Sequence, residues 1–386
     1  MSFADLRAAL PAFRTLSYMN WGAAGPSPTS VVDAIAAVLA DESAHGPYFP
    51  SVRAARDETF TLARCRAATL LGASEDEIAL TDNTTAGVNI VGAAIEWREG
   101  DEVIVTDEEH PGGFVPWLVW RDRRGVRVRV LHVTPDREET LANFRALLGP
   151  RTRLVCLSHI TWWSGIRLPV EAMAPLAHAV GALILLDGAQ TGGQIPLDVT
   201  AIGCDAYTVS GHKWLMGPLG TGALYVSRRA IDALAMPGGG VHGMTSASLG
   251  ALTYAARPGA RRFEISTKSA ALFAGFAEAL RLHLDLGSAA VEVHALSLAE
   301  RCRTGLARLA RVEVLGAVPG KAPATSGLVA FRIDGVTADT AVTALLEKGR
   351  FLVRSVPTSP PAVRVSLHCV NTADEVDQLI DVVGAL

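Results

Sequence analysis

The stretch Thr208-Val-Ser-Gly-His-Lys213-Trp-Leu-Met-Gly-Pro-Leu-Gly-Thr-Gly-Ala-Leu-Tyr225 places one lysine among apolar residues and glycines. A short apolar run leads into Ser210-Gly-His, and the residues after Lys213 are first apolar and then rich in glycine. Desolvation lowers the pKa of an amine, so a lysine in such surroundings is available as a nucleophile or a Schiff base partner. The simpler alternative is a solvated lysine on an exposed turn, with glycines that only shape a hairpin.

A second stretch, Ala182-Leu-Ile-Leu-Leu-Asp187-Gly-Ala-Gln190, favours the reactive lysine. Its continuous apolar run is typical of a parallel strand buried on both faces. The run ends in Asp187, which predicts a carboxylate at the sheet edge where open α/β proteins bind ligands. A buried carboxylate is costly unless it is paired, and a protonated ring nitrogen would pair it.

Asp187-Gly-Ala-Gln190 followed by Ser210-Gly-His-Lys213 resembles the pyridoxal-phosphate enzymes of the class V aminotransferase family. That family includes cysteine desulfurases, isopenicillin N epimerase and related carbon–sulfur lyases, and the resemblance runs from about Met19 to the C-terminus. It implies fold type I, an α/β fold whose large domain has a mainly parallel seven-stranded sheet sandwiched by helices. A smaller α+β domain should complete the chain. We expect the large domain at residues 17–265 and the small domain at residues 1–16 and 266–386.

The resemblance also implies pyridoxal 5'-phosphate as cofactor, held by Lys213 as a Schiff base. Lys213 would then remove the Cα proton of an amino-acid substrate. Asp187 would keep the ring nitrogen protonated, so that the ring can accept the electrons of the carbanion. Gln190 would hold the ring hydroxyl, and Ser210 and His212 would bind the phosphate.

A further phosphate site is expected at Asp82-Asn-Thr-Thr85, between a strand-like run and a helix predicted over Ala86–Ile95. Free amides and the helix dipole favour an anion at such an N-terminus. Plain N-capping by Thr84 or Thr85 is the alternative, and it is compatible with phosphate binding. The resemblance places the phosphate at Thr84 and Thr85.

The segment Arg261-Arg-Phe-Glu-Ile-Ser-Thr267 resembles the family's Phe-Glu-x-x-Thr segment. The threonine of that segment reaches the phosphate of the neighbouring subunit. The resemblance therefore implies that Thr267 binds cofactor in a homodimer whose active site is shared between subunits.

His110 stands before Pro-Gly-Gly and, taken alone, is a turn residue. The resemblance implies instead that its ring stacks face-on over the cofactor and takes part in catalysis, which suits an aromatic face. Gly113 stands where relatives often have asparagine.

Trp162, in Ser158-His-Ile-Thr-Trp162-Trp163, departs from the desulfurase pattern, which usually has an asparagine that hydrogen-bonds the ring hydroxyl. Tryptophan cannot do this in the same way, so Gln190 is expected to hold the hydroxyl alone. The two tryptophans suggest an apolar or aromatic substrate wall, and packing under a neighbouring loop is the alternative.

Arg364, in Val-Arg-Val-Ser, matches the family arginine that clamps the substrate α-carboxylate. A planar guanidinium suits such bidentate binding, although a strand arginine by itself is more often a surface residue. Asn20 lies in a turn-rich entry that lines the active site in the family, so we expect it to contact substrate; a surface turn is the alternative.

The segment Ser355-Val-Pro-Thr-Ser-Pro-Pro-Ala-Val363 bears on the reaction, because it is short, rich in proline and without cysteine. A desulfurase needs a cysteine on a mobile loop there, and Cys369 lies beyond Arg364. Persulfide-forming desulfuration is therefore disfavoured. The leading interpretation is a lyase of a Cβ–S or related Cβ–X bond, followed by an epimerase like the isopenicillin N enzyme and then an aminotransferase. A non-catalytic binding module is a further alternative, against which Asp187 and Lys213 argue.

The composition of the 386-residue chain, with 49% apolar residues and a formal net charge of −4, predicts a large core and no nucleic-acid or anionic-membrane partner. Five scattered cysteines without CxxC or metal spacing favour a reducing compartment and predict no metal site. The start of the chain lacks an apolar signal core, and no apolar run approaches membrane-spanning length. We expect a cytoplasmic enzyme with a small-molecule amino-acid substrate.

Overall fold

A seven-stranded sheet lies at the centre of the computed structural model, which describes residues 1–316 and 322–386. Its order is β2-β8-β7-β6-β5-β3-β4. β8 pairs antiparallel with both neighbours, and the other pairs are parallel. The predicted mainly parallel sheet is thus confirmed. The strands are β2 (Ile78–Thr81), β3 (Glu102–Thr106), β4 (Arg127–Leu131), β5 (Thr152–Ser158), β6 (Leu183–Asp187), β7 (Ala206–Ser210) and β8 (Gly222–Val226).

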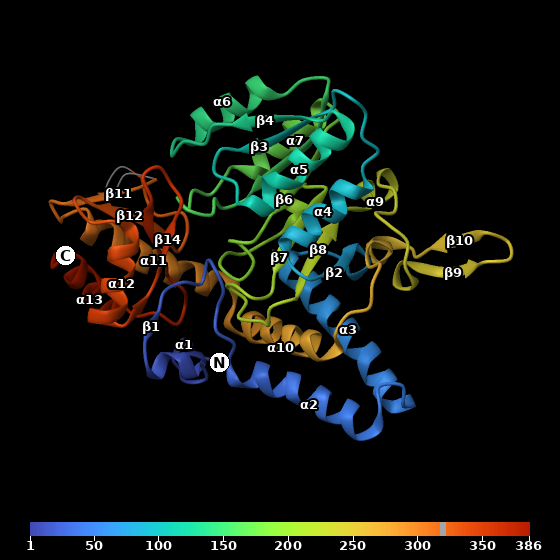
Figure 1. Cartoon of the computed structure of the whole chain (residues 1–386), viewed down its shortest axis with the longest axis horizontal. Coiled ribbons are helices and arrows are strands. Elements are labelled where there is room, and N and C mark those ends of the chain that lie inside the picture. Colours follow the sequence, from blue (N-terminus) through green and yellow to red (C-terminus); the bar gives the residue numbers. More distant parts are fainter. Residues whose placement is uncertain (317–321) are drawn as a thin grey trace.

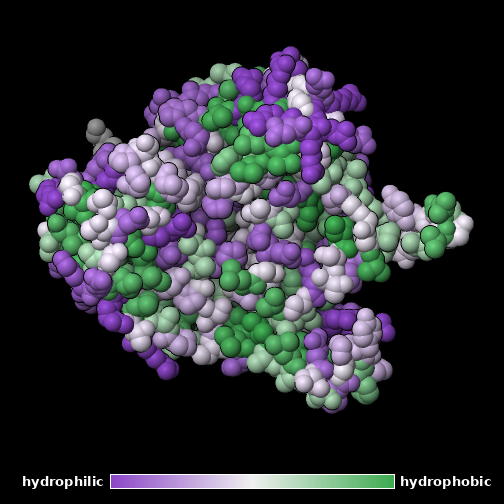
Figure 2. Space-filling view, in the orientation of Figure 1, coloured by the Kyte–Doolittle hydropathy of each residue, from purple (hydrophilic) through white to green (hydrophobic). Residues whose placement is uncertain are grey.

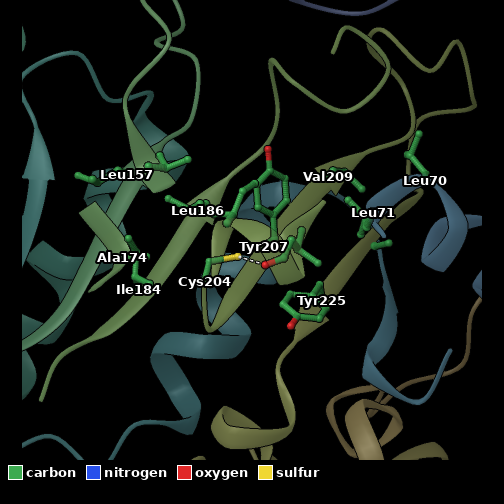
Figure 3. Packing of buried hydrophobic residues seen from close by; sticks show 14 of the residues in the cluster. Leu70, Leu71, Leu157, Ala174, Ile184, Leu186, Cys204, Tyr207, Val209 and Tyr225 are labelled. Carbon is green, nitrogen blue, oxygen red and sulfur yellow. Dashed lines mark hydrogen bonds between the residues drawn. The ribbon is translucent and has the colours of Figure 1, made fainter. Parts of the chain in front are cut away.

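Helices cover both faces of this sheet because its central strands are apolar on both sides (Figure 1). On one face Leu157, Leu186 and Val209 of adjacent strands pack with Leu71 of a covering helix (Figure 3). That face is covered by α3 (Pro50–Leu71), α6 (Arg137–Leu147), α7 (Val170–Ala179), α8 (Val199–Ile202) and α10 (Ala270–Leu286). The other is covered by α4 (Thr84–Ala94), α5 (Pro111–Arg124) and α9 (Arg228–Ala233).

A second, antiparallel sheet in the order β11-β12-β15-β14 forms the smaller part of the molecule. It contains β11 (Val312–Val314), β12 (Leu328–Ile333), β14 (Arg354–Val356) and β15 (Ala362–Ser366), and it packs with α11 (Ser288–Leu306), α12 (Ala338–Gly349) and α13 (Ala373–Gly384). Near the start of the chain, β1 (Ser17–Tyr18) pairs with β13 (Phe351–Leu352). The expected α+β part is confirmed.

Helix α10 bears on where the two domains divide. Its Phe273, Phe276 and Leu280 join the core beneath the large sheet, and it packs along α3 and α2 (Thr29–His45). The predicted division at residue 266 stays a prediction. We propose that the boundary falls after α10 instead, at Gly287, which follows its last residue.

The remaining elements are short helices and one hairpin. They are α1 (Phe3–Ala8), the 3₁₀ turns η1 (Pro11–Arg14), η2 (Glu75–Glu77), η3 (Val241–Gly243) and η4 (Gly259–Phe263), and the strands β9 (Met244–Ser248) and β10 (Thr253–Ala256). The β9–β10 hairpin projects from the body (Figure 1). Leu249, Leu252 and Tyr254 of this segment are exposed. Figure 2 shows hydrophobic residues at the tip of the projection. Among the described residues, no helix is both long and apolar enough to cross a membrane.

Candidate active site

A pocket of about 240 Å³ opens at the carboxyl ends of the central strands, where ligands of open α/β sheets bind. The register brings Ser158, Asp187 and Thr208 side by side at this edge. Nine of the predicted residues line the pocket: Thr84, Thr85, His110, Trp162, Asp187, Gln190, Ser210, His212 and Lys213. Three others, Asn20, Thr267 and Arg364, are not among its lining residues, and neither is Trp163.

Lys213 reaches the pocket from the loop between β7 and β8. Burial lowers the pKa of its amine to about 8, and the charges of Arg364 and Arg354 add to the effect while Asp187 opposes it. The loop is fixed by its backbone: Gly25 N–H donates to the His212 carbonyl at 2.7 Å. A Cβ at Gly25 would lie 2.5 Å from the Lys213 carbonyl oxygen, so this approach requires glycine. The amine is therefore held in place and is easily deprotonated.

Asp187 ends β6 and is only 4% exposed. Its Oδ1 accepts a hydrogen bond from the Ala189 N–H at 2.7 Å. Burial raises the pKa of this carboxyl, and the charge of Lys213 opposes the rise. Such a carboxylate is stabilised by a cationic partner, which a protonated ring nitrogen in the pocket would supply.

Helix α4, whose first residues line the pocket, starts at Thr84, two residues before the predicted start. Capping by Thr84 or Thr85 is wrong, because the side chain of Asn83 accepts from the Ala86 N–H and caps the helix. Thr84 N–H donates to the Ser210 hydroxyl at 3.1 Å, which joins the two predicted phosphate-binding segments. Their hydroxyls and the α4 N-terminus are groups that suit an anion, and phosphate binding by them stays a prediction.

His212 also lines this pocket, and its buried Nδ1 has no hydrogen-bond partner among the described residues. Burial lowers the pKa of the imidazole to about 4, and the charge of Lys213 adds to the shift. The ring is neutral at pH 7 and can donate a hydrogen bond through its protonated nitrogen. A bound phosphate would provide a partner for such a donor.

His110 meets Trp162 edge to face, with ring centroids 5.4 Å apart and an interplanar angle of 88°. Its Nδ1 accepts from the Gly112 N–H at 3.1 Å and so caps α5. Burial lowers the pKa of His110 to about 4, helped by the charges of Lys213 and two arginines. The neutral imidazole and the indole form an aromatic wall of the pocket. Stacking over a bound ring stays a prediction.

Arg364 lies on β15 and is fully buried. Its Nη1 donates to the Trp162 carbonyl at 2.6 Å, whereas Nε and Nη2 have no hydrogen-bond partner among the described residues. Burial lowers its pKa to about 9, and the charge of Arg354 adds to the shift. A buried guanidinium with two free donors on one edge would be stabilised by a carboxylate, as predicted for the substrate.

Asn20 lies beside the end of β15 rather than in the pocket wall. It forms a parallel β-bridge with Ser366, and its buried Oδ1 has no hydrogen-bond partner in the described part of the chain. Contact between Asn20 and substrate stays a prediction.

Thr267 lies outside the pocket and is exposed, with Oγ1 3.3 Å from Nε2 of His242. Its expected contact with a phosphate needs a second subunit, so the shared active site and the homodimer stay predictions. Glu264 of the same segment accepts hydrogen bonds from the Leu80 N–H at 2.9 Å and from Arg64 at 2.7 Å. These two bonds tie the segment to β2 and α3.

Sequence reasoning missed several groups at the site, among them the pocket-lining Arg354. Ser158 lines the pocket, and its hydroxyl donates to buried Glu109 at 2.6 Å. Its place at the end of an apolar strand, like that of Asp187, was a usable signal. Another is Trp214, whose Nε1–H donates to Oε1 of Gln190 at 2.9 Å. The Gln190 Nε2 donates in turn to the Gly22 carbonyl at 2.9 Å.

These groups fit pyridoxal 5'-phosphate. Lys213 supplies an amine for the aldehyde, Asp187 a buried carboxylate for the ring nitrogen, and the α4 N-terminus an anion site. The His212 Nδ1 and one edge of Arg364 have no hydrogen-bond partner within residues 1–316 and 322–386, and a phosphate and a substrate carboxylate would satisfy these buried polar groups.

Comparisons with known proteins agree with this geometry. The aminotransferase class-V family model matches residues 17–379. A probable cysteine desulfurase of Vibrio cholerae is 31% identical and is aligned over 97% of this chain and 96% of its own. A cysteine desulfurase of Haloferax volcanii is also 31% identical, over 96% and 89%.

The chain also resembles the solved structures of C-DES. The cystine C–S lyase C-DES in complex with its product cysteine persulfide has a TM-score of 0.90 and 29% identity over 97% of this chain and 99% of that one. A second C-DES structure, with glycine linked covalently to its pyridoxal-phosphate cofactor, superimposes with the same TM-score of 0.90. The chain therefore belongs to the class V aminotransferase family and is a pyridoxal-phosphate-dependent enzyme with fold type I.

Proposed function

We propose that this enzyme is a carbon–sulfur lyase that cleaves the Cβ–S bond of cysteine or its disulfide, cystine, and releases the sulfur directly. The observation that carries the proposal is the lack of a thiol in the pocket: all five cysteines lie in the described residues, and none lines it. Several relatives are named cysteine desulfurases, and C-DES is named a cystine C–S lyase with cysteine persulfide as product.

The positions of the cysteines argue against storage of sulfur on the enzyme. The β14–β15 connection that follows Arg354 contains none. Cys369 is 1% exposed, and burial raises its pKa to about 12, so its thiolate is scarce. Cys65 lies on α3 with its sulfur 3.2 Å from Glu75, and burial and that carboxylate raise its pKa. A disulfide substrate needs no enzyme thiol, because its leaving group is already a persulfide.

The chain's own residues divide the steps of the reaction between them. The bound cofactor supplies an electron sink for the carbanion. Lys213, as the free amine, takes the Cα proton, and Arg364 binds the α-carboxylate. Asp187 holds a proton on the ring nitrogen, while the α4 N-terminus and Ser210 hold the phosphate. With cystine and water as reactants, loss of the Cβ–S bond gives cysteine persulfide, pyruvate and ammonia, which balances without an added oxidant or reductant.

The test is to incubate the purified holoenzyme with cysteine, cystine and a panel of other amino acids, and to measure pyruvate, ammonia and released sulfide or persulfide. The proposal expects pyruvate and ammonia in equal amounts, with no persulfide on the protein by mass spectrometry. Solvent deuterium at Cα without bond cleavage would identify an epimerase, and an oxo acid without ammonia an aminotransferase. A persulfide on any of the five cysteines during turnover would refute direct release.

The depressed pKa of Lys213 predicts how cofactor uptake depends on pH. Because the pKa lies at about 8 rather than at the ordinary 10.5, the neutral, nucleophilic amine predominates above pH 8. The rate at which cofactor-free protein takes up pyridoxal 5'-phosphate should therefore rise with pH to a plateau, with its midpoint near pH 8. Visible absorbance follows the reaction, and N-acetyl-lysine amide serves as the unburied control. A midpoint that coincides with that of the control would contradict the prediction.

A further inference from the structure

We propose that Trp214, the residue after the cofactor lysine, is a positioning residue that fixes the orientation of the Gln190 amide toward the cofactor. Gln190 lines the pocket three residues after Asp187. The cofactor's phosphate, aldehyde and ring nitrogen are matched by the α4 N-terminus, Lys213 and Asp187. The polar atom left over is the oxygen of the ring hydroxyl, and Gln190 is the pocket amide available for it. This inference rests on the cofactor and not on which bond the enzyme cleaves.

The two neighbours of the Gln190 amide determine which end is oxygen. An indole N–H can only donate, and a backbone carbonyl can only accept. Trp214 Nε1–H lies 2.9 Å from one end of the amide, and the Gly22 carbonyl lies 2.9 Å from the other. The first end must be Oε1 and the second Nε2. One N–H of Nε2 donates to the Gly22 carbonyl, so the second N–H of Nε2 is the donor that remains for a ligand in the pocket.

Gly22 allows this arrangement because it lacks a side chain. A Cβ at this position would lie 3.0 Å from Gln190 Oε1 and 2.9 Å from Nη2 of Arg364. The amide therefore lies close against the Gly22 backbone. The Gly22 backbone restricts rotation of the Gln190 amide on one side, and the Trp214 indole restricts it on the other.

Trp214 is itself held firmly. It is fully buried, and its carbonyl accepts a hydrogen bond from Nε2 of His368 at 2.8 Å. The His368 ring meets the indole edge to face, at 5.4 Å and 84°. Gly193, with φ +95°, packs against the backbone, where a Cβ would lie 2.7 Å from the Trp214 carbonyl carbon. The indole N–H is thus a fixed donor, and the end of the Gln190 amide beside it must be the oxygen.

A donor aimed at the hydroxyl oxygen favours its anionic form and lowers the proton affinity of the lysine-bound chromophore. Without the indole N–H, only the Gly22 carbonyl still opposes a turned amide, and the turned amide presents its oxygen, which repels that anion. The expected sign follows: loss of the donor raises the pH at which the visible absorbance of the holoenzyme titrates. This readout needs no substrate, so it is independent of the proposed lyase activity.

The experiment compares Trp214→Phe with the parent holoenzyme by absorbance titration. Phenylalanine keeps an aromatic ring beside His368 and removes the donor together with part of the ring volume. We expect the titration midpoint to rise by about 0.5–1 pH unit, because a shift of this size corresponds to the partial loss of one charge-assisted hydrogen bond. Trp117→Phe is the matched control, since Trp117 is also fully buried and donates to a backbone carbonyl, that of Gly113, at 2.7 Å. It should leave the midpoint unchanged.

A double-mutant cycle tests whether Trp214 acts through Gln190. Gln190→Ala should raise the midpoint at least as much, and Trp214→Phe added to it should give no further shift. Gln190→Glu, which keeps an acceptor for Trp214 and has no N–H, should raise the midpoint even if Trp214→Phe fails to fold. The proposal would be overturned by an unchanged midpoint in folded Trp214→Phe or in Gln190→Glu. It would also be overturned if Trp214→Phe shifted the midpoint as much in the Gln190→Ala background as in the parent.

Discussion

Replacing Lys213 with alanine should abolish covalent attachment of the cofactor and lower turnover by roughly 10⁴-fold or more, since one side chain serves as both nucleophile and base. No other lysine lines the pocket among the described residues. The two imidazoles that line it, His110 and His212, have pKa values lowered to about 4 by burial, so they are weak bases. Neither can replace an amine whose pKa lies near 8. Absorbance after gel filtration and pyruvate release under saturating substrate measure the two effects.

Two further variants separate the chemistry of Lys213 from its charge. Lys213→Arg keeps a cation beside Asp187, but a guanidinium does not deprotonate, so the loss should equal that of alanine. Lys348→Ala, at an exposed position on α12, should leave both readouts unchanged. A small primary amine added to Lys213→Ala should restore part of the turnover by acting as an external base. Retention of covalently bound cofactor by Lys213→Ala would show that another residue is the attachment site.

The fold and the core of the site were predictable because they depend on local pattern and parallel topology. The run that ends in Asp187 is apolar on both faces, as only a covered parallel strand requires. Parallel strands end at one edge, so Ser158, Asp187 and the loop after Ser210 had to converge there. The motif residues at 187, 190, 210, 212 and 213 accordingly line one pocket.

Contacts between segments far apart in the chain could not be predicted from the sequence. The bond from Arg364 to the Trp162 carbonyl joins residues 202 positions apart, and no spacing rule predicts it. The sequence also did not show which of several neighbouring polar residues caps α4. Asn83 caps it rather than Thr84, because the Asn83 side chain reaches the Ala86 N–H. The amphipathic pattern of α10 predicts a helix but does not say which sheet its apolar face covers, and Phe276 lies beneath the large one.

Asp187→Asn should lower turnover by about 10²–10³-fold while the protein stays folded and keeps its cofactor, because it removes one preorganised charge at the reacting ring. The substitution is nearly isosteric, and the asparagine Oδ1 can still accept from the Ala189 N–H that now binds Oδ1 at 2.7 Å. The remaining amide nitrogen then donates toward the ring nitrogen, which must lose its proton to accept. The ring becomes a poorer electron sink, so removal of the Cα proton by Lys213 slows.

The matched control is Asp205→Asn. Asp205 is another buried aspartate beside the same sheet; it is 2% exposed and pairs with Arg229 and His178. This substitution should lower the free energy of unfolding without changing turnover per folded holoenzyme, because it lies outside the pocket lining. Cα-deuterated substrate distinguishes the mechanism, since an isotope effect on turnover in Asp187→Asn that exceeds the parent's indicates slower proton removal. Full turnover in Asp187→Asn would mean that the ring works without its proton, and Asp187 would then serve only to position the cofactor.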